Sequence, residues 1–308
     1  IVYGANTSVQ KAAGIEDTVE EGYKYLSARA EGWGDDDKIR IPIERSAENI
    51  EWLLKLGVDF PPEAVNISGE EAVPKYAEIT PPKARGHITP LAWGIGLMEP
   101  LKKAVKDRGI ELMVETPAKE LIAHPVTGEV VGVKTEKLNI KARKGVVLAA
   151  GNFVGNPEMI KNYTPQYRNE LTYCAPGLTG DGIRMAQALG ADLRNIGPVN
   201  LRLWAVDFGP HAVSDYYHFG LPTIFGFPIA SVVVVNKKGV RFANEHLYYA
   251  DLCPLILEQP DQKCFCIFDE TGFKLGGAAV LGRCLSMDLS KELEVGIIKT
   301  APTIWDLA

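Results

Sequence analysis

The sequence contains no long run of apolar residues, and it has only five histidines and five cysteines. Its longest apolar stretches, such as residues 226–235, are broken by glycine and proline, whereas a membrane-spanning helix needs about 18 or more apolar residues in succession. Cys264 and Cys266 are separated by a single residue, and zinc or redox motifs need wider spacing. The sequence therefore predicts no membrane span and no metal site, and both cysteines are interpreted as small hydrophobic residues of a buried strand.

The charge balance excludes further classes of partner. The net charge is −6, and acidic and basic residues are interleaved along the chain, so no surface for nucleic acid or for an anionic membrane is predicted. A length of 308 residues is enough for about two domains. Because the chain begins with Ile1 and not with an initiator methionine, we expect the natural N-terminus to lie upstream. The compartment is left open, with the cytoplasm slightly favoured.

Capping and turn signals predict the secondary structure of the first two thirds of the chain. Thr18 and Glu21 form a capping-box pattern, and Ser46 begins an amphipathic segment that Gly57 ends. Asn156 is expected to cap a helix that begins with a proline. The other expected elements are helices over 91–107 and 181–189, strands over 110–115 and 142–150, and a hairpin of strands 120–124 and 130–135.

The composition changes near residue 197. Glycine, proline and aromatic residues are concentrated in residues 197–228, and they follow no helical period. We therefore expect a domain boundary here, with one domain over residues 1–196 and a second over 197–308. The order of elements predicts a mixed α/β fold followed by a smaller α+β unit.

Residues 236–245 are the most informative stretch. A β-branched run ends at Asn236, a Lys-Lys-Gly turn follows, and the returning chain carries Arg241, Asn244 and Glu245. An arginine beside a carboxylate is costly to bury without a purpose. A surface hairpin with a solvated ion pair is the simpler alternative, because exposed pairs are common and contribute little stability.

A second candidate site is the end of the expected strand over residues 142–150. This strand ends in Ala150 and Gly151, whose small side chains would let a ligand approach the backbone at the carboxyl edge of a sheet. Residues 115–118 form a weaker candidate of the same kind. No GxGxxG motif occurs in the chain, so the usual fingerprint of a nicotinamide or flavin site is missing. A plain strand–turn–helix connection is the alternative without a ligand.

A third candidate is the turn at Thr179, Gly180 and Asp181, which opens a helix. Amides at a helix N-terminus favour phosphate, and Asp181 could accept hydrogen bonds from sugar hydroxyls. Asp181 as a simple N-cap is the alternative. Among the histidines, His87 is a candidate for a site, and His124 is expected on the surface of a hairpin.

Together these stretches resemble one group of flavoproteins. The chain is similar to the family that contains soluble fumarate reductases, urocanate reductase and 3-ketosteroid dehydrogenases, over nearly its whole length. No single motif is specific, but the combination is. The motifs that carry the resemblance are residues 4–14, 48–58, 85–87, 148–153, 156–159, 179–182 and 236–245.

The resemblance implies a fold and a cofactor. It implies a Rossmann-like FAD-binding domain over about residues 1–196 and an α+β capping domain over 197–308, both incomplete. The GxGxxG of the family is expected just before Ile1, and its C-terminal segment after Ala308. The residues expected along the FAD are Ala118 near the adenine and, along the ribityl chain and pyrophosphate, Ala150, Gly151, Thr179, Gly180 and Asp181.

The resemblance also implies roles in catalysis. Arg241 matches the arginine that delivers a proton to the substrate in fumarate reductases while flavin N5 delivers hydride. It would act as an acid or by polarising a carbonyl group, with Glu245 orienting it and Tyr248 as a substrate contact or proton donor. The residues expected to contact the substrate are His87, Arg202, His218 and Asn244.

The sequence departs from fumarate reductases in the residues around the substrate. Asn152 replaces a glycine, residues 197–201 lack the expected histidine, and the apolar stretch 221–228 replaces an acidic residue. A buried dicarboxylate needs cationic partners, and few are present. The resemblance, with these departures, therefore implies an FAD-dependent oxidoreductase that reduces or forms a C=C bond conjugated to a carbonyl in an apolar small molecule, with an unidentified electron donor or acceptor. A fumarate-type dicarboxylate enzyme and a folded fragment that binds no flavin are the alternatives.

Overall fold

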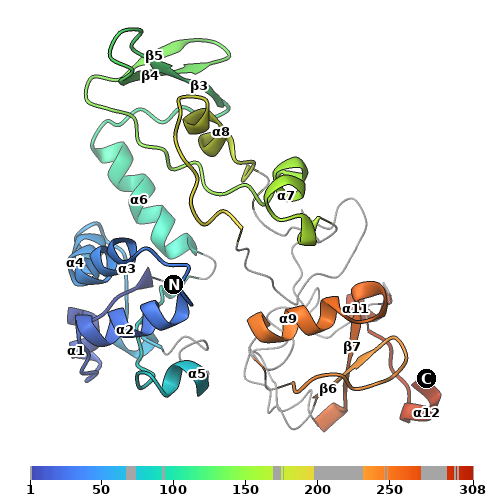
Figure 1. Ribbon diagram of the computed structural model, residues 1–308. Helices are drawn as coiled ribbons and strands as arrows, with labels where there is room; N and C mark the ends of the chain where they lie inside the picture. The colour runs from blue at the N-terminus through green and yellow to red at the C-terminus, as the bar shows by residue number, and fades with distance from the viewer. Residues whose placement is uncertain are drawn as a thin grey trace. The chain divides into compact units, whose positions relative to one another are not determined.

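The computed structural model describes residues 2–66, 74–91, 94–168, 175, 177–197, 232–245, 247, 249–271, 290–294, 296 and 298–307 (Figure 1). The chain divides into two compact units, Ile1–Glu115 and Thr116–Ala308. The expected boundary near residue 196 separates a cofactor-binding part from a capping part, and it stays a prediction.

Helices make up most of the first unit (Figure 1). They are α1 (Ser8–Ala12), α2 (Val19–Arg29), α3 (Asp36–Glu44), α4 (Ser46–Lys55), the short 3-10 helix η1 (Pro62–Ala64), α5 (Pro74–Ala77) and α6 (Ile95–Asp107). Two predicted helix starts are confirmed, because Thr18 caps α2 by accepting a hydrogen bond from the Glu21 amide at 3.1 Å and α4 begins at Ser46. Gly57 follows α4 with a φ of 90°, which glycine adopts without strain.

A short sheet and a hydrophobic core hold the first unit together. Strand β1 (Val2–Tyr3) pairs with β2 (Gly86–His87) in antiparallel register, and Gly86 also bridges to Asn66. The core joins α1 to α4 and to the segment that follows α4. It consists of Val9, Ile50, Leu53, Val58 and Phe60, with Leu97 and Leu101 of α6 packed against it.

The second unit begins with a three-stranded antiparallel sheet of β3 (Ala118–Ala123), β4 (Val130–Thr135) and β5 (Asn139–Lys141). This sheet confirms the predicted hairpin, and His124 is exposed at its turn. The described elements that follow are α7 (Pro157–Tyr163), η3 (Pro165–Tyr167), α8 (Asp181–Gln187), β6 (Val232–Asn236), α9 (Tyr249–Leu257), η6 (Pro260–Gln262), β7 (Cys264–Phe268), α11 (Ser290–Glu294) and α12 (Ile304–Leu307).

Strands β6 and β7 form an antiparallel pair in which Val234 lies opposite Cys266. Val234 is fully buried against Leu252 and Ile256 of α9, and the two cysteines of β7 pack against the same core. Burial raises the pKa of the Cys264 thiol to about 11, so this thiol stays protonated at neutral pH. The packing of the two cysteines agrees with their interpretation as small hydrophobic residues, but β7 is not the buried strand that was expected, because Phe265 is 54% exposed.

Two expected strands are wrong. Residues 110–115 and 142–150 form no strand, and several of their apolar side chains are exposed, with Leu112 at 72% and Val147 at 91%. A strand is stable where its backbone groups find partners on a neighbouring strand, and neither segment joins a sheet of the described residues, although the Ala142 amide donates to the Val131 carbonyl at 2.8 Å. The apolar composition of these two segments was therefore not enough to predict a strand.

Helices and sheets both contribute to the fold, in agreement with the expected mixed α/β class. Every strand pair in the described residues is antiparallel, so these residues do not include the parallel sheet of a Rossmann-like domain. None of the helices in this part of the chain is long and apolar enough to cross a lipid bilayer.

Candidate functional site

The predicted hairpin at residues 236–245 begins at the end of β6. The side-chain oxygen of Asn236 accepts hydrogen bonds from the amides of Lys238 at 2.9 Å and Val240 at 3.1 Å. Gly239 takes a φ of 72° at the turn, as predicted. The returning chain brings Arg241 opposite Val235 in an antiparallel bridge.

Arg241 and Glu245 form a bidentate ion pair. Nε of Arg241 donates to Oε1 of Glu245 at 2.9 Å, and Nη2 donates to Oε2 at 2.5 Å. The Glu245 side chain is 4% exposed and the Arg241 side chain is 59% exposed. The pair is therefore neither a solvated surface pair nor a buried one, because a buried carboxylate holds an accessible guanidinium.

The ion pair changes the acidity of both partners. The hydrogen bond from Arg241, with a further bond from the Val234 amide at 2.9 Å, outweighs burial and lowers the pKa of Glu245 from 4.5 to about 2. The carboxylate in turn raises the pKa of Arg241 above its ordinary value. Glu245 is thus an anion at neutral pH, and it holds a proton on Arg241.

The remaining residues predicted near this hairpin are only partly within the described chain. Asn244 is exposed between Arg241 and Glu245 in sequence, and its backbone carbonyl accepts from the Leu247 amide at 3.0 Å. Tyr248, Arg202 and His218 lie outside the described residues.

The segments predicted to contact a cofactor approach one another in the second unit. The Gly180 amide donates to the Asn152 carbonyl at 3.0 Å, and the side chain of Asn156 donates to the Thr179 carbonyl at 3.0 Å. Gly182 is packed so closely that a methyl group on it would lie 3.1 Å from the Cβ of Ala150. The segment that ends at Ala150 and the turn at Thr179 are therefore neighbours.

Two glycines are required for this packing. Gly180 has a φ of 76°, and a methyl group on it would lie 2.4 Å from the sulfur of Met159. Gly151 also has a φ of 76°, and its methyl group would lie 2.3 Å from Cδ2 of Leu178. Both positions have a left-handed backbone, which favours glycine. At Gly180 a methyl group would also lie 2.8 Å from the Cβ of Phe153, which cannot rotate away, whereas the Leu178 side chain beside Gly151 can move.

Asp181 is not the N-cap of α8, because that position belongs to Gly180. One carboxylate oxygen accepts from Nη2 of Arg184 at 2.5 Å and the other from the Thr179 hydroxyl at 2.9 Å. These two partners lower the pKa of Asp181, and the charge of Lys119 on β3 contributes. Helix α8 packs against β3, the strand that begins with Ala118. The structure thus gathers all six residues predicted along a cofactor into one region.

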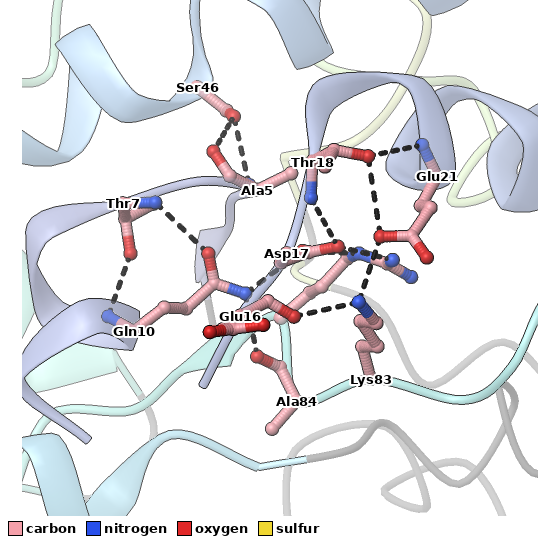
Figure 2. Close-up of polar contacts among 11 residues, drawn as sticks. Ala5, Thr7, Gln10, Glu16, Asp17, Thr18, Glu21, Ser46, Lys83 and Ala84 are labelled. Carbon is pink, nitrogen blue, oxygen red and sulfur yellow. Dashed lines mark hydrogen bonds and ion pairs between the residues drawn. The ribbon is translucent and has the colours of Figure 1, made fainter. Parts of the chain in front are cut away.

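The sequence did not predict a buried polar cluster in the first unit (Figure 2). The side chains of Asp17 and Arg85 are both fully buried, with Nε and Nη2 of Arg85 donating to the two carboxylate oxygens at 2.7 and 2.6 Å. Gln10 joins them by donating to Asp17 at 3.0 Å and to the Ala84 carbonyl at 2.9 Å. Lys83 binds the Glu16 carbonyl at 2.7 Å next to this pair.

The capping box of α1 extends this cluster. The amide of Gln10 donates to the Thr7 hydroxyl, and the Thr7 amide donates to the Gln10 side chain, each at 3.0 Å. The signal that could have revealed this end of the cluster is the Thr-Ser-Val-Gln pattern at residues 7–10, since it fits a capping box.

His87 belongs to this cluster and is fully buried. Its Nδ1 lies 3.0 Å from the Arg85 carbonyl, which can only accept, so Nδ1 carries the proton and Nε2 accepts from the Thr7 hydroxyl at 2.8 Å. Burial lowers the pKa of His87, which keeps the ring neutral. Both ring nitrogens are thus occupied inside the protein. The expected contact of His87 with a substrate stays a prediction that this geometry does not support.

No group of three or more His, Cys, Asp or Glu side chains in the described part of the chain is arranged to hold a metal ion. Two regions can therefore contribute to chemistry or binding. One is the hairpin, where a buried carboxylate holds the accessible Arg241 guanidinium. The other is the glycine-rich turn that precedes the short helix α8.

Comparisons with known proteins identify the family of this chain. The family model described as FAD binding domain matches residues 3–269. A probable fumarate reductase from Shewanella frigidimarina is 29% identical over 87% of this chain and 43% of its own length. The chain thus spans less than half the length of this relative.

Two solved structures are similar in fold and sequence. A flavocytochrome c3 fumarate reductase in an open conformation matches with a TM-score of 0.73 and 27% identity, over 89% of this chain and 45% of its own. The 3-ketosteroid-Δ4-(5α)-dehydrogenase from Rhodococcus jostii RHA1 matches with a TM-score of 0.69 and 27% identity, over 90% of this chain and 59% of its own. The family predicted from the sequence is confirmed, and the chain belongs to the flavoproteins with this FAD-binding domain.

Proposed function

We propose that this chain is the central part of an FAD-dependent oxidoreductase that reduces or forms a C=C bond conjugated to a carbonyl. The observation that carries the proposal is the ion pair of Arg241, whose side chain is 59% exposed while that of its partner Glu245 is 4% exposed. Burying the Glu245 carboxylate costs folding free energy, and a buried anion that holds an accessible cation is typical of a functional site.

The glycine-rich region of the second unit fits FAD. Gly151 and Gly180 have a left-handed backbone and no side chain, and Ala150 and Gly151 are exposed, so a ligand can approach their backbone closely. Thr179 and Asp181 add a hydroxyl and a carboxylate suited to sugar hydroxyls. We propose that these residues and Ala118 hold the cofactor, which when bound supplies or takes up hydride.

The role of the chain's own residues follows from the ion pair. Reduction adds a hydride to one carbon of the double bond and a proton to its neighbour, and the carbonyl oxygen gains negative charge on the way. The Nε and Nη2 bonds of Arg241 to Glu245 leave Nη1 to approach that oxygen. Because Glu245 raises the pKa of Arg241, stabilising this charge is favoured over donating the proton. A proton given up by Arg241 would have to be replaced by a group other than Glu245, whose pKa is about 2.

The relatives and the sequence together support the proposed substrate class. One relative is named as a fumarate reductase, and one solved structure is a ketosteroid dehydrogenase in complex with 4-androstene-3,17-dione. The apolar stretch 221–228 of this chain favours a carbonyl compound with an apolar body over a dicarboxylate. Both classes contain a double bond conjugated to a carbonyl or carboxylate.

The test uses the full-length protein that contains this chain. Its visible spectrum should show bound flavin, and reduced viologen should drive reduction of an enone such as 4-androstene-3,17-dione faster than reduction of fumarate. Arg241→Ala should keep the flavin spectrum and lower kcat by about a hundredfold or more. Arg45→Ala is the matched control, since Arg45 pairs with Glu48 on the surface, where the two side chains are 67% and 69% exposed.

Each outcome decides one part of the proposal. A protein that shows no flavin spectrum even after addition of FAD would be a folded module without this activity. Faster turnover of fumarate would assign the dicarboxylate class, and full turnover by Arg241→Ala with bound flavin would reject the role of Arg241.

A further inference from the structure

The hairpin that carries Arg241 is attached to the end of helix α9 by a chain of side-chain hydrogen bonds. Nδ2 of Asn236 donates to Oε1 of Gln259 at 3.0 Å, and Nε2 of Gln259 donates to the Leu255 carbonyl at 2.9 Å. Asn236 is 8% exposed although it ends a strand beside a turn. A buried amide whose partners are all satisfied fixes one geometry and disfavours others.

Asn236 determines the path of the chain towards Arg241. Its backbone amide donates to the Val240 carbonyl at 2.9 Å, and its carbonyl accepts from the Gly239 amide at 2.9 Å. Its side-chain oxygen binds two further amides of the same turn, those of Lys238 and Val240. Every polar group of Asn236 is thus used, and the next residue after this turn is Arg241.

The side-chain orientations in this chain of bonds are determined by their partners. The oxygen of Asn236 faces two N–H donors, so its nitrogen must face Gln259. The nitrogen of Gln259 faces a carbonyl, so its oxygen must face Asn236. Only this orientation of the two side-chain amides avoids donor–donor and acceptor–acceptor contacts.

The same helix also supports the carboxylate that holds Arg241. Leu252 and Ile256 of α9 pack against Val234, and the Val234 amide donates to Glu245 at 2.9 Å. The position of the guanidinium therefore depends on two attachments. One is its ion pair with Glu245, which is hydrogen-bonded to the Val234 amide. The other is the Arg241 backbone, whose path is determined by the turn that Asn236 holds. Both attachments depend on how β6 lies against α9.

We propose that Asn236 and Gln259 are positioning residues, which hold Arg241 at the place where the proposed reaction needs its guanidinium. This inference rests on the proposed function of Arg241. Neither residue touches the guanidinium, so both act through the turn and not through its charge. Displacement of a catalytic group by about 1 Å can cost about a hundredfold in rate.

The experiment compares variants of the full-length protein with bound FAD, using the enone reduction described above. Gln259→Ala removes the bond to Asn236, and Asn236→Ala also removes the two turn bonds. Both should lower kcat by about tenfold or more and leave KM within about threefold, since the binding of the substrate is not changed. Asn236→Asp keeps an acceptor for both turn amides but cannot donate to the Gln259 oxygen, and the Gln259 nitrogen is held by the Leu255 carbonyl. This variant should therefore lose only the bond to Gln259 and be slowed about as much as Gln259→Ala, and less than Asn236→Ala.

A second measurement does not depend on turnover. Hydrogen exchange of the backbone amides in residues 236–245 should be faster in Gln259→Ala and Asn236→Ala. The matched control is Lys237→Ala in the same turn, which removes only the exposed pair with Asp261, where the side chains are 63% and 55% exposed. This control should change neither kcat nor the exchange of the other amides.

The outcomes separate this inference from the proposed function. Normal kcat in Gln259→Ala and Asn236→Ala would overturn the inference, whether or not exchange is faster. A loss of rate no larger than that of Lys237→Ala, or an Asn236→Asp variant as slow as Asn236→Ala, would also overturn it. Full activity of Arg241→Ala would instead remove the proposed role of Arg241 itself.

Discussion

Replacement of Asp17 by asparagine should strongly destabilise the first unit. The Asp17 carboxylate accepts from Arg85 and Gln10 at one oxygen, and from Arg85 and the Thr18 amide at the other. Asparagine has nearly the same shape, but one of its two terminal groups is an NH2 donor. Whichever way the amide turns, its nitrogen faces two N–H donors.

The magnitude follows from these four bonds and from the burial of the pair. Two hydrogen bonds are lost, and each bond to a charged group contributes about 1.5–3 kcal/mol. The Arg85 guanidinium, which is 0% exposed, also keeps its charge without the anion. Removal of one partner from a buried ion pair costs about 3–5 kcal/mol, so we expect a loss of about 4 kcal/mol in the free energy of unfolding.

Urea denaturation followed by circular dichroism measures this loss. With a slope of about 2–3 kcal/mol per M, the unfolding midpoint of the first unit should fall by more than about 1 M. Glu48→Gln is the matched control, because it removes the same charge from an exposed pair with Arg45, and it should change the stability by less than about 1 kcal/mol. A double variant, Asp17→Leu with Arg85→Met, should be more stable than Asp17→Asn. A loss in Asp17→Asn no larger than in Glu48→Gln would refute the reasoning.

Three further predictions concern single residues. Because the pKa of His87 is lowered in the folded state, its contribution to stability is complete above its ordinary pKa of 6.5 and decreases as the pH falls below that value; His87→Gln should lose this slope in stability measured from pH 8 to 5. Folding lowers the pKa of Glu245 from 4.5 to about 2, so its contribution to the free energy of unfolding is present above pH 4.5 and is lost as the pH falls towards 2. Glu245→Gln should remove this pH dependence and lower the free energy of unfolding by about 1–3 kcal/mol. A dependence of stability on acid pH equal to that of the wild type would contradict the assignment. Gly180→Ala should lower the melting temperature and weaken FAD binding, because its methyl group would lie 2.4 Å from the Met159 sulfur; Gly190→Ala, which has a φ of 89° and no atom within 4 Å, separates the effect of crowding from that of backbone strain.

Local signals in the sequence predicted the local structure well. The caps at Thr18 and Asn156, the helix start at Ser46 and the turn at Gly239 each depend on hydrogen bonds between residues close in sequence. Such contacts are determined by the residue types within one turn of the chain. The family was also predicted from the sequence, and the comparisons confirm it.

Contacts between distant segments were predicted less well. The strand expected over 142–150 fails because a strand needs a partner, and composition does not say whether one is present. The sequence placed Arg241 beside Glu245, but only the fold shows that the carboxylate is buried and the guanidinium is exposed. Asp17 and Arg85 are far apart in the sequence, and nothing local marks them as a buried pair.

The contact between Met159 and Gly180 has a consequence for the chemical ageing of the protein. Oxidation of a methionine to its sulfoxide adds an oxygen atom to the sulfur and makes it polar. The Met159 sulfur is buried against the turn that carries Thr179 and Asp181, with no space for even a methyl group between it and Gly180. A sulfoxide at Met159 would displace this turn as Gly180→Ala does, without any change in the gene. If this turn holds the flavin as proposed, oxidation of this one methionine would weaken the binding of flavin.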